Sequence, residues 1–480
     1  MPDPASVFAL PPAASSLSFG AIATIGVAAS LALRAPPAAA EPVPGPPPPA
    51  TAEPAPAPPT LAIRVPMHHP NGYSDPPPTN VAELRDRGPA ALAELLATWH
   101  LLLARNEPVD PAWTGVIDAV AGQRYATWSE LYWYTDLARA EQEARRLHRP
   151  ILALRLLGDL REDLSCANSR LFRATLYANR GVSEFLRSHF VLYWSSERPV
   201  PKVTIDFGDG RKLQRTVTGN SVHYVLDADG HVLDVLPGLY APQVFQRELT
   251  RSLALAARVR GASADERIRA TVAYHTAAIA ETERGWRASY GDLAMPRAPG
   301  LPTARELGLA QRAAISKRVI EVPLLRAIGA VAPGEVPDDT ATWSAIGRRL
   351  LNLPAYRVAP HGPNIIPPPE LLDEQSADLV GELMAPEDPL GDFESARRAV
   401  DITAAYARLV QHIIADTAQN ELRLRPAIRR HIVDQEVTDF AQLNAWIYDA
   451  VFATPQRDLW LGLLGSPDFT GLPGDGVVMP

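Results

Sequence analysis

The chain has 480 residues and a formal net charge of −8, and only one of its residues is a cysteine. That length is enough for two or three domains once terminal tails are set aside. The acidic balance provides no basic surface, which argues against a nucleic-acid partner, and a single cysteine excludes an intramolecular disulfide framework.

The first 40 residues have the pattern of an exported protein. Residues 4–33 carry no charge, residues 17–33 form a weakly apolar run, and Ala38-Ala39-Ala40 is an A-x-A-like cleavage pattern. We therefore predict that residues 1–40 are a signal peptide or an N-terminal anchor, with residues 17–33 as the membrane tether. This would place the protein in the periplasm or at the membrane of a bacterial-type envelope. The run has no Lys or Arg before it, so a disordered Ala/Pro-rich tail on a cytoplasmic protein is the alternative.

A proline-rich linker and a helical lead-in follow. Residues 41–79 contain proline tracts such as Pro46 to Pro49, which favour an extended chain without a core. Residues 80–127 are predicted to be helical, because residues 81–103 place apolar side chains at helical spacing with an interruption at Gly88. Residues 128–147 show a second helical pattern, which ends before Pro150.

The next segment predicts a strand, a thiol at a helix start, a helix and a second strand. Residues 151–157 are almost continuously apolar, as in a strand that is buried on both faces. Ser165 is a suitable N-cap for a helix that begins at Cys166, with a break near Gly181. Residues 191–194 form the next predicted strand.

Two hairpins and a helix complete this part of the chain. The first hairpin joins residues 203–207 to 212–217 through Gly208-Asp209-Gly210. The second joins residues 222–226 to 232–236 through a turn that ends at Gly230. Residues 242–253 are predicted to form a closing helix.

The remainder, residues 254–480, is predicted to be mainly helical. Ser263 and Glu266 have the spacing of a capping box, which opens a helix that continues to Tyr290. Further helices are predicted at residues 307–325, 341–351, 396–432 and 440–452, with a stop or restart at Pro426, and linkers at residues 295–302 and 360–369.

Residues 128–253 resemble thioredoxin-like domains. In residues 166–191, a cysteine opens an amphipathic helix that leads to an aromatic-Val strand start, and residues 224–230 with Pro237-Gly238 are similar to the family's final hairpin and the glycine after it. The resemblance implies an α/β domain with a mixed central sheet and flanking helices, followed here by the mainly α-helical C-terminal region.

The chain departs from that family at the site of its chemistry. Ser169 stands in the place of the second, resolving cysteine, which gives a C-x-x-S motif, and Ser221 stands where the family has a cis-proline. The loop at residues 158–165 is long and acidic, and the hairpin within residues 198–218 is an addition. Without a second thiol, Cys166 could form a mixed disulfide but could not resolve it internally.

Two functions remain open for Cys166. As a monothiol thiol-disulfide oxidoreductase, the protein would use Cys166 as its nucleophile and Ser169 as hydrogen-bond support, with Arg170 and Ser221 beside them, and the helix N-terminus would stabilise the thiolate. As a non-catalytic module, it would bury the cysteine and bind a protein partner. The departures favour the second. Neither function calls for a cofactor or a metal, and the oligomeric state is left open.

Other polar and aromatic residues have weaker claims. His68 and His69 lack a companion acidic or cysteine cluster, so a metal role is disfavoured. His412, Asp416 and Asn420 share one helix face with Glu421 beside them, which suits either a helix-packing stripe or a hydrolase or metal site. His223 and His231 are interpreted as cross-strand surface residues. A set of C-terminal aromatics is interpreted as core: Trp446, Tyr448, Phe452, Trp460 and Phe469.

Overall fold

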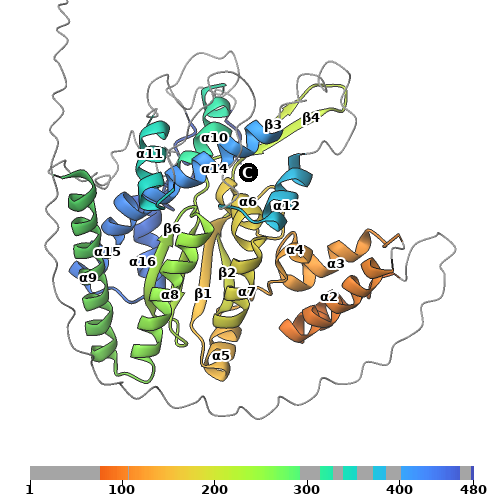
Figure 1. Ribbon diagram of the computed structural model, residues 1–480. Helices are drawn as coiled ribbons and strands as arrows, with labels where there is room; N and C mark the ends of the chain where they lie inside the picture. Colours follow the sequence, from red (N-terminus) through yellow and green to blue (C-terminus); the bar gives the residue numbers. More distant parts are fainter. Residues whose placement is uncertain are drawn as a thin grey trace, which may run out of the picture. The chain divides into compact units, whose positions relative to one another are not determined.

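A mixed four-stranded sheet carries the candidate site in the computed structural model (Figure 1). The structure describes residues 76–105, 108–291, 314–327, 339–353, 371–384, 402–464 and 477–479. Strand β1 (Ile151–Leu157) pairs in parallel with β2 (Val191–Arg198) and antiparallel with β5 (Val222–Leu226), which pairs antiparallel with β6 (Val232–Pro237). The order is therefore β2-β1-β5-β6, and the predicted mixed sheet with flanking helices is confirmed.

The additional hairpin forms a sheet of its own. Strands β3 (Lys202–Asp206) and β4 (Lys212–Thr216) pair antiparallel and are mostly exposed. Gly208 and Gly210 both have positive φ, 79° and 95°, in the connecting turn, a conformation that glycine adopts without steric cost. The first predicted hairpin is confirmed.

From residue 76 onward, where the structure describes the chain, five helices precede the sheet: α1 (Val81–Asp86), α2 (Pro89–Ala104), α3 (Ala112–Ala121), α4 (Ala126–Ser129) and α5 (Leu137–Leu147). The continuous helix predicted over residues 128–147 is wrong in its first half. Glu130 has a left-handed backbone that ends α4. Tyr134 forms a parallel bridge with Tyr193 of the sheet. The Asp136 side chain caps α5 by accepting a hydrogen bond from the Arg139 N–H. Pairing with the sheet therefore overrides the helical spacing.

The connection between β1 and β2 contains α6 (Ala167–Phe172), the π-helical turn η1 (Arg173–Tyr177) and α7 (Arg180–His189). The break before α7 falls at Asn179, whose side chain accepts a hydrogen bond from the Val182 N–H, two residues before the predicted position at Gly181.

The helices after the sheet are α8 (Pro242–Val259), α9 (Ala264–Tyr290), α10 (Ile315–Ala327), α11 (Thr340–Leu350), α12 (Glu374–Met384), α14 (Ile402–Gln419), α15 (Arg425–Gln435) and α16 (Phe440–Trp446), with π-helical turns η3 (Asn420–Leu424) and η4 (Ile447–Val451). The capping box of Ser263 and Glu266 is confirmed at the start of α9. Pro426 lies in the first turn of α15, directly after η3, so the helix restarts there.

Helices cover both faces of the sheet at β5. His223 and Tyr224 are neighbours, so their side chains project to opposite faces. His223 contacts the Phe245 ring of α8 at 5.0 Å, whereas Tyr224 contacts the Phe440 ring of α16 at 4.9 Å. Every residue of β5 and β6 is consequently buried, and the predicted helical C-terminal region supplies one of the two covering layers.

Several predictions lie outside the described residues: the leader, the linker as far as residue 75, His68, His69, Phe469 and the linkers at residues 295–302 and 360–369. In the part of the chain that is described, no helix has both the length and the apolar character needed to span a bilayer. The proposed domain boundaries stay a prediction.

Candidate functional site

Cys166 lies directly after the β1–α6 loop and is fully buried. It is the N-cap of α6, with an extended backbone, so the helix begins at Ala167 rather than at the predicted Cys166. Its backbone N–H donates to the Leu157 carbonyl at 3.2 Å. The Cys166 side chain makes no capping hydrogen bond to α6, so no amide at the start of this helix binds the sulfur.

Two serine hydroxyls contact the thiol instead. Cys166 Sγ lies 3.0 Å from Ser221 Oγ and 3.4 Å from Ser169 Oγ. Ser169 Oγ is in turn 2.8 Å from both Ser165 Oγ and the Cys166 carbonyl oxygen. All these side chains are fully buried. The structure thus brings Cys166, Ser169 and Ser221 together, across 55 residues of sequence, into one hydrogen-bonded cluster.

The segment that precedes β5 closes over the thiol. Gly219 lies so near to Cys166 that a Cβ on Gly219 would overlap with Cys166 Cβ, and it would also approach Leu157 Cβ to 3.3 Å. Only a residue without a side chain allows this approach. The backbone around Gly219 therefore packs directly on the Cys166 side chain and covers it.

A buried ion pair on α10 holds the segment around Gly219 in place. Lys317 Nζ is 3.5 Å from Glu321 Oε2 and 3.3 Å from Asn220 Oδ1. The same Glu321 oxygen accepts the Thr218 N–H at 2.9 Å. Lys317 and Glu321 are fully buried, so two charges are placed in the interior beside residues 218–220 and satisfy each other there.

The C-terminal helices contribute a further contact. Tyr448, in η4, donates from its hydroxyl to the Asn220 carbonyl oxygen at 3.0 Å, and Asn168 of α6 donates from Nδ2 to Asn220 Oδ1 at 3.3 Å. Asn220 thereby links three parts of the chain. Each of these contacts restricts the opening of the segment that covers Cys166.

Arg170 uses its guanidinium to bind Thr216 and not the Cys166 sulfur. Its Nη1 donates to Thr216 Oγ1 at 2.9 Å, and Thr216 Oγ1 donates to the Ser165 carbonyl at 3.0 Å. Burial lowers the pKa of Arg170. Arg170 therefore connects α6 to the β4 end of the additional hairpin.

The acidic loop at residues 158–165 is folded around Arg173, which sequence reasoning missed. Arg173 Nη1 donates to the carbonyls of Leu160 and Glu162 at 2.7 and 2.8 Å, and Nη2 donates to Ser165 Oγ at 3.2 Å. Burial lowers its pKa to about 10, so it stays charged at neutral pH. The signal in the sequence is a lone charged residue in the run 171–176, whose other members are apolar except Thr175.

The acids of that loop are engaged by their own partners. Asp163 accepts from Arg124 Nε at 3.0 Å and from the Tyr125 hydroxyl at 3.0 Å, and Asp159 forms an ion pair with Arg161. These contacts neutralise the loop and secure it over the start of α6. They lie beside a thiol that is itself fully buried.

The interpretation of His223 as a surface residue is wrong, because β5 is covered on both faces. His223 is fully buried, its Nε2 is 2.7 Å from the Tyr177 hydroxyl, and the Phe172 ring lies 4.7 Å away. Burial lowers its pKa to about 3, so it is neutral at physiological pH. His231, in contrast, is half-buried and pairs with Asp227 at 3.2 Å.

Of the polar residues predicted on or beside one helix face, Asp416, Asn420 and Glu421 bind different segments of the chain. Asp416 accepts from the N–H groups of Ile315 and Ser316 at the start of α10, and burial raises its pKa to about 6. Asn420 donates to the Leu239 carbonyl at 2.7 Å, and Glu421 pairs with Arg425. Burial lowers the pKa of His412. Among the described residues, no group of three or more His, Cys, Asp or Glu is arranged to hold a metal.

Comparisons with protein-family models, with curated proteins and with solved structures found no match for this chain.

Proposed function

We propose that this protein is a non-catalytic, thioredoxin-like module that binds a protein partner in the cell envelope. The observation that carries the proposal is the complete burial of Cys166 against Ser169, Ser221 and the backbone of Gly219. A thiol must reach its disulfide in order to attack it, and this sulfur is covered on every side that those contacts define.

The order of elements supports the thioredoxin-like part of the proposal. The sheet is built in the order strand, cysteine at a helix start, parallel strand and two antiparallel strands, and α8 closes the set. The additional hairpin β3–β4 is inserted between the two parallel strands and the antiparallel pair. On this proposal, the buried serine cluster would stand at the position where a redox member of that family presents its dithiol. Fold alone does not carry activity, and the residues at this site favour binding over catalysis.

The monothiol oxidoreductase is the second candidate, and one comparison separates the two. We would produce the full chain with its natural Cys166 and as Cys166→Ala, capture each from the cells that produce it, and separate the captured proteins without reductant. The proposal predicts the same partner with both chains, resistant to dithiothreitol. It also predicts no glutathione-dependent reduction of bis(2-hydroxyethyl) disulfide by either chain.

The opposite pattern would support the enzyme. Partners that appear only with Cys166 and leave on addition of dithiothreitol would be mixed disulfides. Disulfide reduction that disappears in Cys166→Ala would then assign the turnover to this thiol and overturn the binding proposal.

A further inference from the structure

A second site lies away from Cys166, on the helices that cover β6. A cavity of about 380 Å³ is bounded by α8, α9, α11, η3 and α15. Its size falls in the lower range of small-molecule pockets. One part of its wall is apolar or aromatic, with Trp286, Tyr290, Ile346, Leu350 and Leu422. The rest of the wall is strongly charged.

Arginines outnumber acids around this cavity. Four arginines line it (Arg247, Arg251, Arg349 and Arg429), against three glutamates (Glu248, Glu281 and Glu421). Behind the wall, Arg425 and Asp234 add one charge of each sign and pair with each other at 2.7 Å. The formal charge of the whole set is therefore one positive, and an anion of one charge would balance it.

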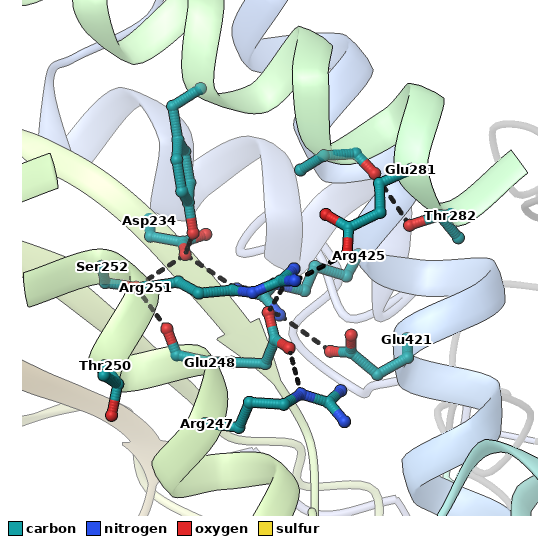
Figure 2. A network of polar contacts seen from close by, with 12 residues as sticks. Asp234, Arg247, Glu248, Thr250, Arg251, Ser252, Glu281, Thr282, Glu421 and Arg425 are labelled. Atoms are coloured by element: carbon teal, nitrogen blue, oxygen red, sulfur yellow. Dashed lines mark hydrogen bonds and ion pairs between the residues drawn. The ribbon is translucent and has the colours of Figure 1, made fainter. Parts of the chain in front are cut away.

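The glutamates already have partners in the protein (Figure 2). Glu248 accepts from Arg247 Nε at 2.8 Å and from Arg425 Nη1 at 2.8 Å. Glu281 accepts from Arg251 at 2.6 Å, and Glu421 accepts from Arg425 at 2.8 Å. The hydrogen bonds of these acids therefore go to Arg425, Arg247 and Arg251 rather than to the remaining two arginines.

Arg429 and Arg349 make no hydrogen bond with these acids. Arg429 is 3 % exposed, and its Nη2 and Nε make no hydrogen bond to the described residues. Its Nη2 is 3.7 Å from Glu248 Oε2, beyond hydrogen-bond distance. Arg349 lies with its guanidinium 5.2 Å from the centre of the Tyr290 ring, and Tyr290 stacks on Trp286 at 4.2 Å. A buried guanidinium with unused donors is costly unless an acceptor reaches it.

We infer that this cavity binds a small organic monoanion with a ring-bearing, apolar body. Its carboxylate would accept from Arg429 and Arg349, and its body would lie against the aromatic and aliphatic part of the wall. Guanidinium groups suit such anions because they present parallel donors. This inference goes beyond the proposed function and does not depend on Cys166.

Calorimetric titration of the full chain with three probes tests the inference. Benzoate carries a ring and one negative charge, benzyl alcohol has the ring without the charge, and acetate has the charge without the ring. We expect benzoate to bind at least about tenfold more tightly than either of the others, and its binding to weaken at high salt. Equal binding of benzoate and benzyl alcohol, or no binding of benzoate, would overturn the inference.

Matched substitutions locate the site. Arg349→Gln removes an exposed arginine of the cavity wall, so the fold is expected to survive. The affinity for benzoate should fall at least about tenfold. Arg251→Gln is a second variant at an exposed residue of the wall. It leaves Glu281 without its partner, so the affinity for benzoate should fall as well. The control is Arg430→Gln, which lies next to Arg429 but outside the wall and pairs with Glu283. An equal loss in the control and the wall variants would place the binding elsewhere.

Discussion

Replacing Arg425 by Met is expected to lower the free energy of unfolding by about 3–5 kcal/mol. Arg425 is fully buried and pairs with Asp234, Glu248 and Glu421 at 2.7 to 2.8 Å (Figure 2). Without the guanidinium, these carboxylates would face one another in the interior with much less compensation. Chemical denaturation of the full chain measures the loss.

The control for this variant is Arg430→Met on the same helix. Arg430 is 47 % exposed and pairs with Glu283 at 3.4 Å, so its loss should cost at most about 1 kcal/mol. Losses of equal size in the two variants would contradict the assignment of the stabilising role to the buried network.

The pH dependence of the free energy of unfolding of Arg425→Met provides a second measurement. Although burial opposes it, the positive charges of Arg425 and Arg429 hold the pKa of Asp234 well below its ordinary value. A carboxyl whose pKa is lower in the folded state stabilises the fold above its unfolded pKa of about 4. That contribution disappears as the pH falls toward the folded pKa, and Arg425→Met should flatten this acid-side decline.

Glu321→Leu is expected to cost about 3–5 kcal/mol, because it leaves the Lys317 ammonium buried without its carboxylate. Both side chains are fully buried and 3.5 Å apart. The Thr218 N–H would lose its acceptor as well, which adds about 1–3 kcal/mol to the penalty if no water replaces it. Chemical denaturation again gives the measurement.

The double variant Lys317→Met with Glu321→Leu isolates the charge. It exchanges the ion pair for apolar side chains of similar size, so we expect it to recover most of the stability that Glu321→Leu loses. The matched control is Glu283→Leu, which removes the acid of an exposed pair with Arg287 on α9 and should cost at most about 1 kcal/mol. A double variant as unstable as Glu321→Leu would show that the charge is not the cause.

Local sequence signals predicted the elements well where the governing contacts are themselves local. The capping box of Ser263 and Glu266 places the start of α9, and the apolar run of residues 151–157 becomes β1 with the same bounds. The cysteine, Ser169 and Ser221 were chosen from their places in the motif, and the fold does bring them into contact. The roles assigned to them remain predictions.

Long-range contacts account for what the sequence could not predict. In β5, apolar and polar side chains do not alternate, because helices cover both faces, and so the strand pattern gave no sign that His223 is internal. Lys317 and Glu321 have the i, i+4 spacing of an ordinary surface pair, and only the packing of α10 on residues 218–220 buries them. Tyr134 leaves its helical pattern because it pairs with Tyr193.

The alkylation rate of Cys166 by N-ethylmaleimide tests the central claim most directly, since any label on the chain must be on this residue. The full chain would be labelled at neutral pH in its native state and in denaturant, with Cys166→Ser as the blank. We predict native labelling at least about 100-fold slower than in denaturant, because the covering segment must open first, at a cost of about 3 kcal/mol or more. Native labelling as fast as in denaturant would contradict the account and identify Cys166 as an accessible thiol.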